Sequence, residues 1–333
     1  MAIDIENPGA DAAELANALR GAMGARELLT ADRTYYVRPD GNDSNNGLAN
    51  TSGGAFLTIQ KAVDTVAYGL DIQKHEVTIN VADGTYAPFI LPEIVGGTLD
   101  DSFDPNVPVP PLVYIVGNPT TPANVLVTRA AVADGKAYCI AASGAASRWW
   151  IKGFRFTMTG AGYGLLVAAS HSARLWFTDI EVGSTGNDAG YQFYSYSHAA
   201  IYLDGTLKIS DDPYVVFYSQ LGCITNISSA VTLSGTPAWG NAFVQCQQGS
   251  DFNFYTSSLT GSATGKRFSL DTSSYIVTIG TDPPGDVAGI VDATSSYNGV
   301  IGPVPLIPQF PTADPHIAGV WWDNAGTLTK SAG

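Results

Sequence analysis

Short apolar runs separated by small-residue corners recur along the chain between residues 137 and 280. Each unit holds an apolar or aromatic run, a corner such as Ser-Gly or Ser-His, a second run, and a break at Gly, Asp or Pro. The units begin at Ala137, Tyr163, Tyr191, Tyr214, Ala242 and Lys266, so their starts are 26, 28, 23, 28 and 24 residues apart. This repeat is typical of a solenoid, in which each coil buries its apolar face against the next.

The runs favour strands over helices. They are rich in Tyr, Phe, Val, Ile and Thr, which suit a pleated surface, and they end after a few residues at Gly, Asp, Asn or Pro. The links between them are too short to hold the crossover helices of a doubly wound sheet. We therefore predict an all-β fold, a right-handed parallel β-helix, with the handedness that parallel connections prefer.

Segments before and after the repeat divide the chain further. Residues 10–29 predict a helix, with Asp11 as its cap and Leu15, Leu19 and Met23 in an apolar stripe. It is expected either to cover the first coil or to attach the protein to a partner. Five prolines between Pro303 and Pro315 and an Asp-Asn-Ala-Gly hairpin turn mark a different C-terminal segment. The predicted units are a helical attachment or capping segment (1–33), the β-helix (34–300) and a proline-rich arm (301–333).

Composition narrows the function classes. The chain has 333 residues, 45% of them hydrophobic, and a net charge of −14. That charge, without any basic run, argues against a nucleic-acid partner. No apolar stretch is long enough for a membrane span, and the first twenty residues do not resemble a signal peptide. Cys139, Cys223 and Cys246 have no metal-binding spacing and are expected to be buried thiols. No cofactor is expected.

An Asp- and Asn-rich stretch precedes the first coil. Residues 35–47 read YYVRPDGNDSNNG, and residues 55–64 read AFLTIQKAVD, an amphipathic helix. The alternating oxygens from Asp40 to Asn46 suggest a calcium loop, but Gly is missing at its sixth position and Thr51 stands where a bidentate Glu belongs. We expect Asx turns there instead of a metal.

This stretch resembles the opening of the pectin-lyase-like right-handed β-helix proteins, over residues 35–66. The resemblance implies the fold and leaves the activity open, because the same opening heads lyases, hydrolases, epimerases and non-catalytic phage tail spikes. The C-terminal sequence, DPHIAGVWWDNAGTLTKSAG, resembles the ends of many phage structural proteins. Together the two resemblances imply a virion protein that forms a homotrimer, as tail spikes do, and that meets other virion proteins through residues 1–33 and 301–333. The acidic, proline-rich excursion from Pro92 to Pro111 is expected to be a solvated insertion or an edge that meets a partner.

Candidate chemistry lies in the coils. Asp179 and Asp204 fall in the second runs of consecutive coils, two residues apart in register, and are the best pair for glycoside hydrolysis. A lyase would need a basic residue beside a carboxylate trio, and no such group stands out. Ser170-His171 and Ser197-His198 occupy equivalent corners and predict a ladder of stacked histidines.

Aromatic residues crowd neighbouring coils, and alternation places about half of them outside. The outward set is expected to contact sugar rings or a second copy of the chain. Its predicted members are Tyr191, Tyr194, Tyr196, Tyr202, Tyr218 and Trp176.

The predicted function is a non-catalytic structural protein of a bacteriophage particle, a tail spike, fibre or surface decoration, that contacts host-surface glycans. Two alternatives stay open at this point. The first is a polysaccharide depolymerase, hydrolase or lyase, that acts on host capsule or lipopolysaccharide through Asp179 and Asp204. The second is a glycan-binding module without turnover.

Overall fold

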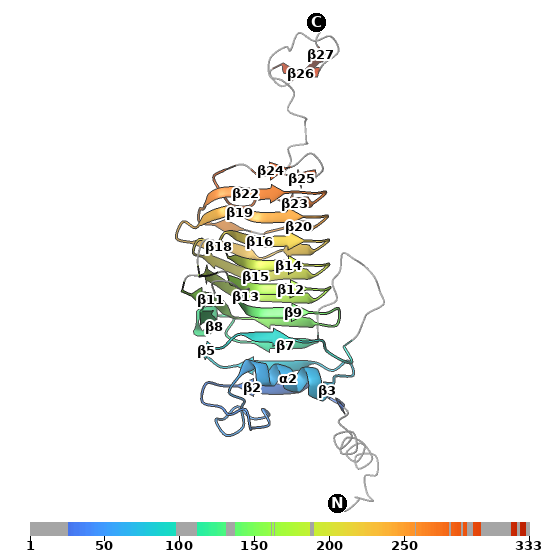
Figure 1. Ribbon diagram of the computed structural model, residues 1–333, viewed down its shortest axis with the longest axis vertical. Coiled ribbons are helices and arrows are strands. Elements are labelled where there is room, and N and C mark those ends of the chain that lie inside the picture. The colour runs from blue at the N-terminus through green and yellow to red at the C-terminus, as the bar shows by residue number, and fades with distance from the viewer. Residues whose placement is uncertain are drawn as a thin grey trace, which may run out of the picture.

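The chain winds into stacked parallel strands (Figure 1). The computed structural model describes residues 26–97, 112–130, 137–160, 162, 164–186, 190–256, 258–279, 281–287, 289–291, 296–300, 321–324 and 327–330. Two large parallel sheets, of 15 and 8 strands, form the walls, and each strand pairs with a strand one coil away. The all-β parallel β-helix predicted from the repeat is confirmed.

The 15-stranded sheet has a main path and a branch. The main path runs through β2 (Arg33–Val37), β4 (Val77–Val81), β7 (Val113–Val116), β10 (Arg148–Lys152), β13 (Arg174–Thr185), β15 (Ala200–Ser210), β17 (Ile224–Ile227), β20 (Asp251–Phe254), β23 (Tyr275–Ile279) and β25 (Ser296–Val300). The branch consists of β5 (Gly84–Tyr86), β8 (Val125–Ala130), β11 (Arg155–Thr159), β18 (Ala230–Ser234) and β21 (Leu259–Thr260). The branch joins the main path at two long strands. β13 pairs with both β10 and β11, and β15 pairs with both β17 and β18.

The 8-stranded sheet forms the other wall. Its strands, in spatial order, are β24 (Ile290–Val291), β22 (Thr264–Leu270), β19 (Ala238–Gln247), β16 (Val215–Gln220), β14 (Tyr191–Tyr196), β12 (Gly164–Ser170), β9 (Ala137–Ser143) and β6 (Phe89–Leu91). Its register follows the sequence repeat, because Leu165 pairs with Tyr191, Tyr191 with Val215, Val215 with Ala242 and Ala242 with Lys266. The first residue of each unit predicted from the sequence, from Tyr163 to Lys266, lies within two residues of the residue that occupies this register position.

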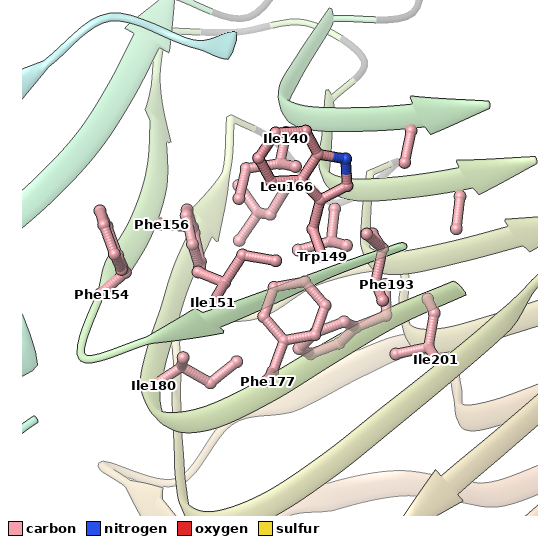
Figure 2. Packing of buried hydrophobic residues seen from close by; sticks show 14 of the residues in the cluster. Ile140, Trp149, Ile151, Phe154, Phe156, Leu166, Phe177, Ile180, Phe193 and Ile201 are labelled. Atoms are coloured by element: carbon pink, nitrogen blue, oxygen red, sulfur yellow. The ribbon is translucent and has the colours of Figure 1, made fainter. Parts of the chain in front are cut away.

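Inward side chains of successive coils stack into one continuous core. Figure 2 shows part of it, where Trp149, Ile151 and Phe177 meet side chains from the opposite sheet. Phe193 and Phe217, in neighbouring coils, stack with ring centroids 4.7 Å apart. The tight turn between β10 and β11 needs a glycine at position 153. Gly153 has a φ of 71°, and the Cβ of any other residue there would lie 2.4 Å from the backbone of Asn118.

The three cysteines lie in this core as free thiols, which confirms the prediction for them. Burial raises the pKa of the Cys139 thiol to about 12, and it raises the pKa values of Cys223 and Cys246 as well. These thiols therefore stay protonated and behave as small apolar groups.

Helix α2 (Ile59–Gly69) covers the first coil (Figure 1). Its buried face carries Ile59, Ala62, Val63, Val66 and Ala67, which belong to the same core as the strands. Thr58 caps the helix by accepting a hydrogen bond from the backbone N–H of Lys61. Asp43 accepts hydrogen bonds from the backbone N–H groups of Leu57 and Thr58, so the turn before the helix also holds its start.

The Asx turns predicted in this stretch are confirmed. Asn42 Oδ1 accepts from the Ser44 N–H at 2.9 Å, and Asn46 Oδ1 accepts from the Leu48 N–H at 3.0 Å. Two of the oxygens that suggested a calcium loop, Asn42 Oδ1 and Asn46 Oδ1, therefore accept hydrogen bonds from the backbone of their own turn. Asp40 pairs with the guanidinium of Arg38.

The predicted helix over residues 10–29 lies mostly outside the described residues. Its last part is not helical, because β1 (Glu27–Leu28) pairs in parallel with β3 (Leu70–Asp71) beside the end of α2. Most of the acidic excursion to Pro111 and most of the proline-rich arm also lie outside the described residues. The C-terminal hairpin turn is confirmed, since β26 (Trp321–Asn324) and β27 (Thr327–Lys330) pair antiparallel. A short 3-10 helix, η1 (Pro122–Asn124), precedes β8. No described helix has both the length and the apolar character of a membrane span.

Candidate functional site

Tyrosines gather on the outer surface of the 8-stranded sheet. They come from β14, β16 and the turn before β16, and we call Tyr191, Tyr194, Tyr196, Tyr214 and Tyr218 the tyrosine face. Tyr194 stacks on Tyr218 with parallel rings 5.3 Å apart, and Tyr191 lies 4.9 Å from Tyr218. Tyr194 and Tyr196 are nearly parallel neighbours on one strand, 6.4 Å apart.

Strand alternation produces this face from the same coils that build the core. In β14 the side chain of Phe193 is buried, whereas its neighbour Tyr194 is partly exposed. In β16 the pair Phe217 and Tyr218 repeats the pattern one coil later. These two coils thus carry a phenylalanine stack inside and a tyrosine stack outside.

Two amide side chains hold the Tyr218 hydroxyl. The Tyr218 hydroxyl donates to Gln247 Oε1 at 2.8 Å and lies 3.1 Å from Gln220 Oε1. Burial, the largest cause, raises the pKa values of Tyr194 and Tyr218, and the neighbouring tyrosines act in the same direction. The phenols therefore remain neutral and supply hydrogen bonds at physiological pH.

Smaller side chains lie beside the tyrosine face. The Cα partners of Tyr194 and Tyr196 in the preceding strand β12 are Ala168 and Ser170, and β9 continues with small residues. His171 lies at the corner, 6.4 Å from the Tyr196 ring, with its Nδ1 3.2 Å from Ser143 Oγ. The tyrosine rings thus form a step above a floor of small side chains.

A second aromatic row runs along the outer surface of the 15-stranded sheet. Tyr114, Trp150, Trp176 and Tyr202 are Cα partners on β7, β10, β13 and β15, and we call them the tryptophan row. Trp176 stacks on Tyr202 with centroids 4.7 Å apart, and Lys152 Nζ lies 4.1 Å from the centre of Trp150.

The six aromatic residues predicted from the sequence therefore belong to two faces. Tyr191, Tyr194, Tyr196 and Tyr218 lie on one sheet, and Trp176 and Tyr202 lie on the other. Trp176 is only 6% exposed, because its neighbours in the row cover it. The prediction omitted Tyr114 and Trp150 from the outward set. The signal for Trp150 was its spacing to Lys152, which places both on the outward side of β10.

Asp179 and Asp204 both act as hydrogen-bond acceptors at one corner. Asp179 Oδ1 accepts from the backbone N–H of Thr206 at 3.0 Å and from its hydroxyl at 2.9 Å. Asp204 accepts from the Thr178 hydroxyl, which in turn accepts from Trp150 Nε1. The Cα partner of Asp204 is Thr178, and the register shifts beyond it. These bonds give both carboxylates a role in shaping the turn.

The predicted ladder of stacked histidines is not formed in register. Ser170 pairs with Tyr196 and Arg174 pairs with Ala200, which aligns His171 with Ser197 and Ser172 with His198. The two Ser-His corners are equivalent, as predicted, but the imidazoles are offset by one residue. Within the described part of the chain, no group of three or more His, Cys, Asp and Glu side chains has the arrangement of a metal site.

No protein-family sequence model and no curated protein sequence matches the chain. Among solved structures, a pectin methylesterase from carrot matches with a TM-score of 0.42 and 12% sequence identity, over 80% of this chain and 88% of that one.

Proposed function

We propose that this protein is a non-catalytic structural component of a bacteriophage particle, a tail spike, fibre or surface decoration, that binds host-surface glycans through its tyrosine face. The observation that supports glycan binding is the tyrosine step above a floor of small side chains, from Ala168 and Ser170. The resemblance of the C-terminal end to phage structural proteins supports the virion assignment, and the resemblance at residues 35–66 is compatible with it.

The chemistry of the face suits sugars. Aromatic rings contact the apolar faces of pyranose rings, and phenol and amide groups exchange hydrogen bonds with sugar hydroxyls. Tyr194 and Tyr196 supply two nearly parallel rings, while Tyr218, Gln220 and Gln247 supply fixed polar groups nearby. Because neighbouring rings hold one another in place, little conformational entropy is lost when a ligand binds.

A glycan-binding experiment tests this function. The purified protein is applied to an array of bacterial capsule and lipopolysaccharide glycans, and bound glycans are then titrated in solution. We expect Tyr194→Ala and Tyr196→Ala to weaken binding by about tenfold or more. Tyr68→Ala, which removes a 63% exposed tyrosine from helix α2, is the matched control and should change nothing. Binding that survives both β14 substitutions would refute the role of the tyrosine face.

The virion assignment needs its own test. We expect antibodies against the purified protein to decorate intact particles of the phage that encodes it, and we expect the protein to have the mass of a homotrimer in solution. Particles that remain unlabelled would contradict a surface position. A stable monomer at micromolar concentration would contradict the trimer.

A further inference from the structure

Two arginines lie next to each other beside the tryptophan row. Arg148 on β10 and Arg174 on β13 are direct Cα partners, and the alternation of both strands places their side chains outward. Neighbouring strands lie about 4.8 Å apart, so the two like charges are held close together by the backbone. Like charges directly opposite each other are destabilising unless an anion lies between them.

The neighbours of this pair in the same row carry no charge. By continuation of the register, Leu112 lies one coil before Arg148, and Glu76 lies one coil further away. On the other side, Arg174 pairs with Ala200, and Ala200 pairs with Ile224. The immediate neighbours of the pair in this row, Leu112 and Ala200, are therefore apolar.

Elsewhere in this β-helix, cations and carboxylates pair across coils. Glu181 lies 3.4 Å from Arg155 and 3.3 Å from Lys208, which are its partners in the two adjacent coils. Arg33 on β2 forms an ion pair with Glu27 on β1, at 2.7 Å. Among the residues that the structure describes, no carboxylate lies within ion-pair distance of Arg148 or Arg174. The polar contact of Arg148 is with the backbone carbonyl of Ala145, at 3.4 Å.

The local field is positive although the protein carries a net charge of −14. Partial burial, and then the charge of Arg174, lower the pKa of Arg148. Both arginines also act on Tyr202, where their charges oppose the rise in pKa that burial causes. A positive spot on an acidic protein attracts anions against the field of the rest of the surface.

Aromatic side chains border this pair. Trp150, Trp176 and Tyr202 lie two residues along the strands from the arginine row, so they are the next outward side chains. Lys152 lies beyond Trp150 and adds a third cation. Asp204 lies two residues after Tyr202 on β15, and its carboxylate accepts a hydrogen bond from the Thr178 hydroxyl. The aromatic edge spans three coils, or about 10 Å, beside a cationic corner.

We propose that Arg148 and Arg174 bind the carboxylate of an acidic saccharide whose sugar ring lies against the partly exposed side chains of Trp150 and Tyr202, which Trp176 supports from between them. A guanidinium binds a carboxylate through two parallel hydrogen bonds, and two adjacent guanidinium groups fix its position. The aromatic edge provides the apolar contact that a sugar ring offers and a free inorganic anion lacks. This site lies on a different sheet from the tyrosine face and does not depend on it.

Uronic-acid oligosaccharides and their methyl esters test the proposal directly. Tetrasaccharides from hyaluronan and from polygalacturonate are titrated into the full-length protein by calorimetry, beside the same compounds with esterified carboxyl groups. We expect at least one acid to bind about tenfold or more tightly than its ester, and we expect added salt to weaken this difference. The double variant Arg148→Gln/Arg174→Gln should bind acid and ester equally.

Matched variants show whether the preference for the acid comes from this arginine pair. Arg38→Gln, at a partly exposed arginine of the first coil, and Tyr68→Ala, at a 63% exposed tyrosine of helix α2, should leave that preference unchanged. Trp150→Ala should weaken acid and ester alike. Melting curves of every variant show that the fold is retained.

Several results would overturn the proposal. Equal affinity for acid and ester, or an acid preference that survives the double variant, would remove the arginines from the site. Inorganic phosphate that binds as tightly as the tetrasaccharides would reduce it to a site for bare anions. Absence of binding to every acid tested, with the wild-type protein folded, would likewise contradict the proposal.

Discussion

Phe217 tests whether packing between coils stabilises the fold. Its side chain is 1% exposed, and its ring lies 4.7 Å from Phe193, 5.4 Å from Phe243 and 5.4 Å from Phe252. Phe217→Ala removes these contacts and leaves a cavity between coils that the fixed strand spacing prevents from closing. We expect a loss of about 4 kcal/mol in the free energy of unfolding, the middle of the range for buried phenylalanines.

The measurement is equilibrium unfolding in urea, followed by circular dichroism and by tryptophan fluorescence. The control is Tyr68→Ala, an aromatic truncation at a 63% exposed position, which should change the free energy of unfolding by less than about 0.5 kcal/mol. Because coils contact only their neighbours, the Phe217 variant should also separate the transitions seen by the two probes. A cost for Phe217→Ala as small as that for Tyr68→Ala would refute stacking of coils as the source of stability.

Three further predictions concern charged and titrating groups. Glu181→Gln leaves Arg155 and Lys208 without their shared carboxylate, and urea unfolding should show a loss of about 1–2 kcal/mol, limited by the exposure of both cations. Asp179 has a φ of 53° and accepts two bonds from Thr206, so Asp179→Ala should cost about 1–3 kcal/mol, whereas Asp179→Asn, which tolerates this backbone conformation, should cost less than half as much. An equal cost for the two variants would contradict this role in the turn. Burial raises the pKa values of Tyr194, Tyr202 and Tyr218 above 10.0, so the unfolded chain loses these protons first. Stability should therefore be unaffected by these groups below pH about 10 and should fall as the pH rises further, and tyrosinate absorbance should appear at higher pH in the folded protein than in urea. Coincident titration curves would contradict this.

Much of the fold could be predicted from the sequence, because the hydrophobic pattern repeats with the period of the coils. Strand β14 begins at Tyr191, as predicted, and its partners start close to the predicted unit boundaries. The helix that covers the first coil is harder to identify from the sequence. Residues 10–29 and residues 55–63 both show an amphipathic pattern, and only packing reveals that α2 seals the core.

The candidate site is harder to predict from the sequence than the fold is. Alternation shows that half of the aromatic residues point outward, but it does not say on which sheet a strand lies. The sequence pattern therefore does not separate Tyr194 from Trp176, which belong to different faces. The adjacency of Arg148 and Arg174 depends on an exact register across a corner, where one inserted residue changes every pairing, as the shift after Thr178 shows.

Binding and turnover measured together on one glycan test the central claim most directly. The protein is incubated with a host capsule or lipopolysaccharide glycan that it binds, and the same sample is assayed for bound protein, for new reducing ends and for unsaturated sugars. We predict saturable binding that Tyr194→Ala weakens, with no release of either product over many hours. Release of product that is lost on Asp179→Ala or Asp204→Ala would contradict this account and would identify a depolymerase.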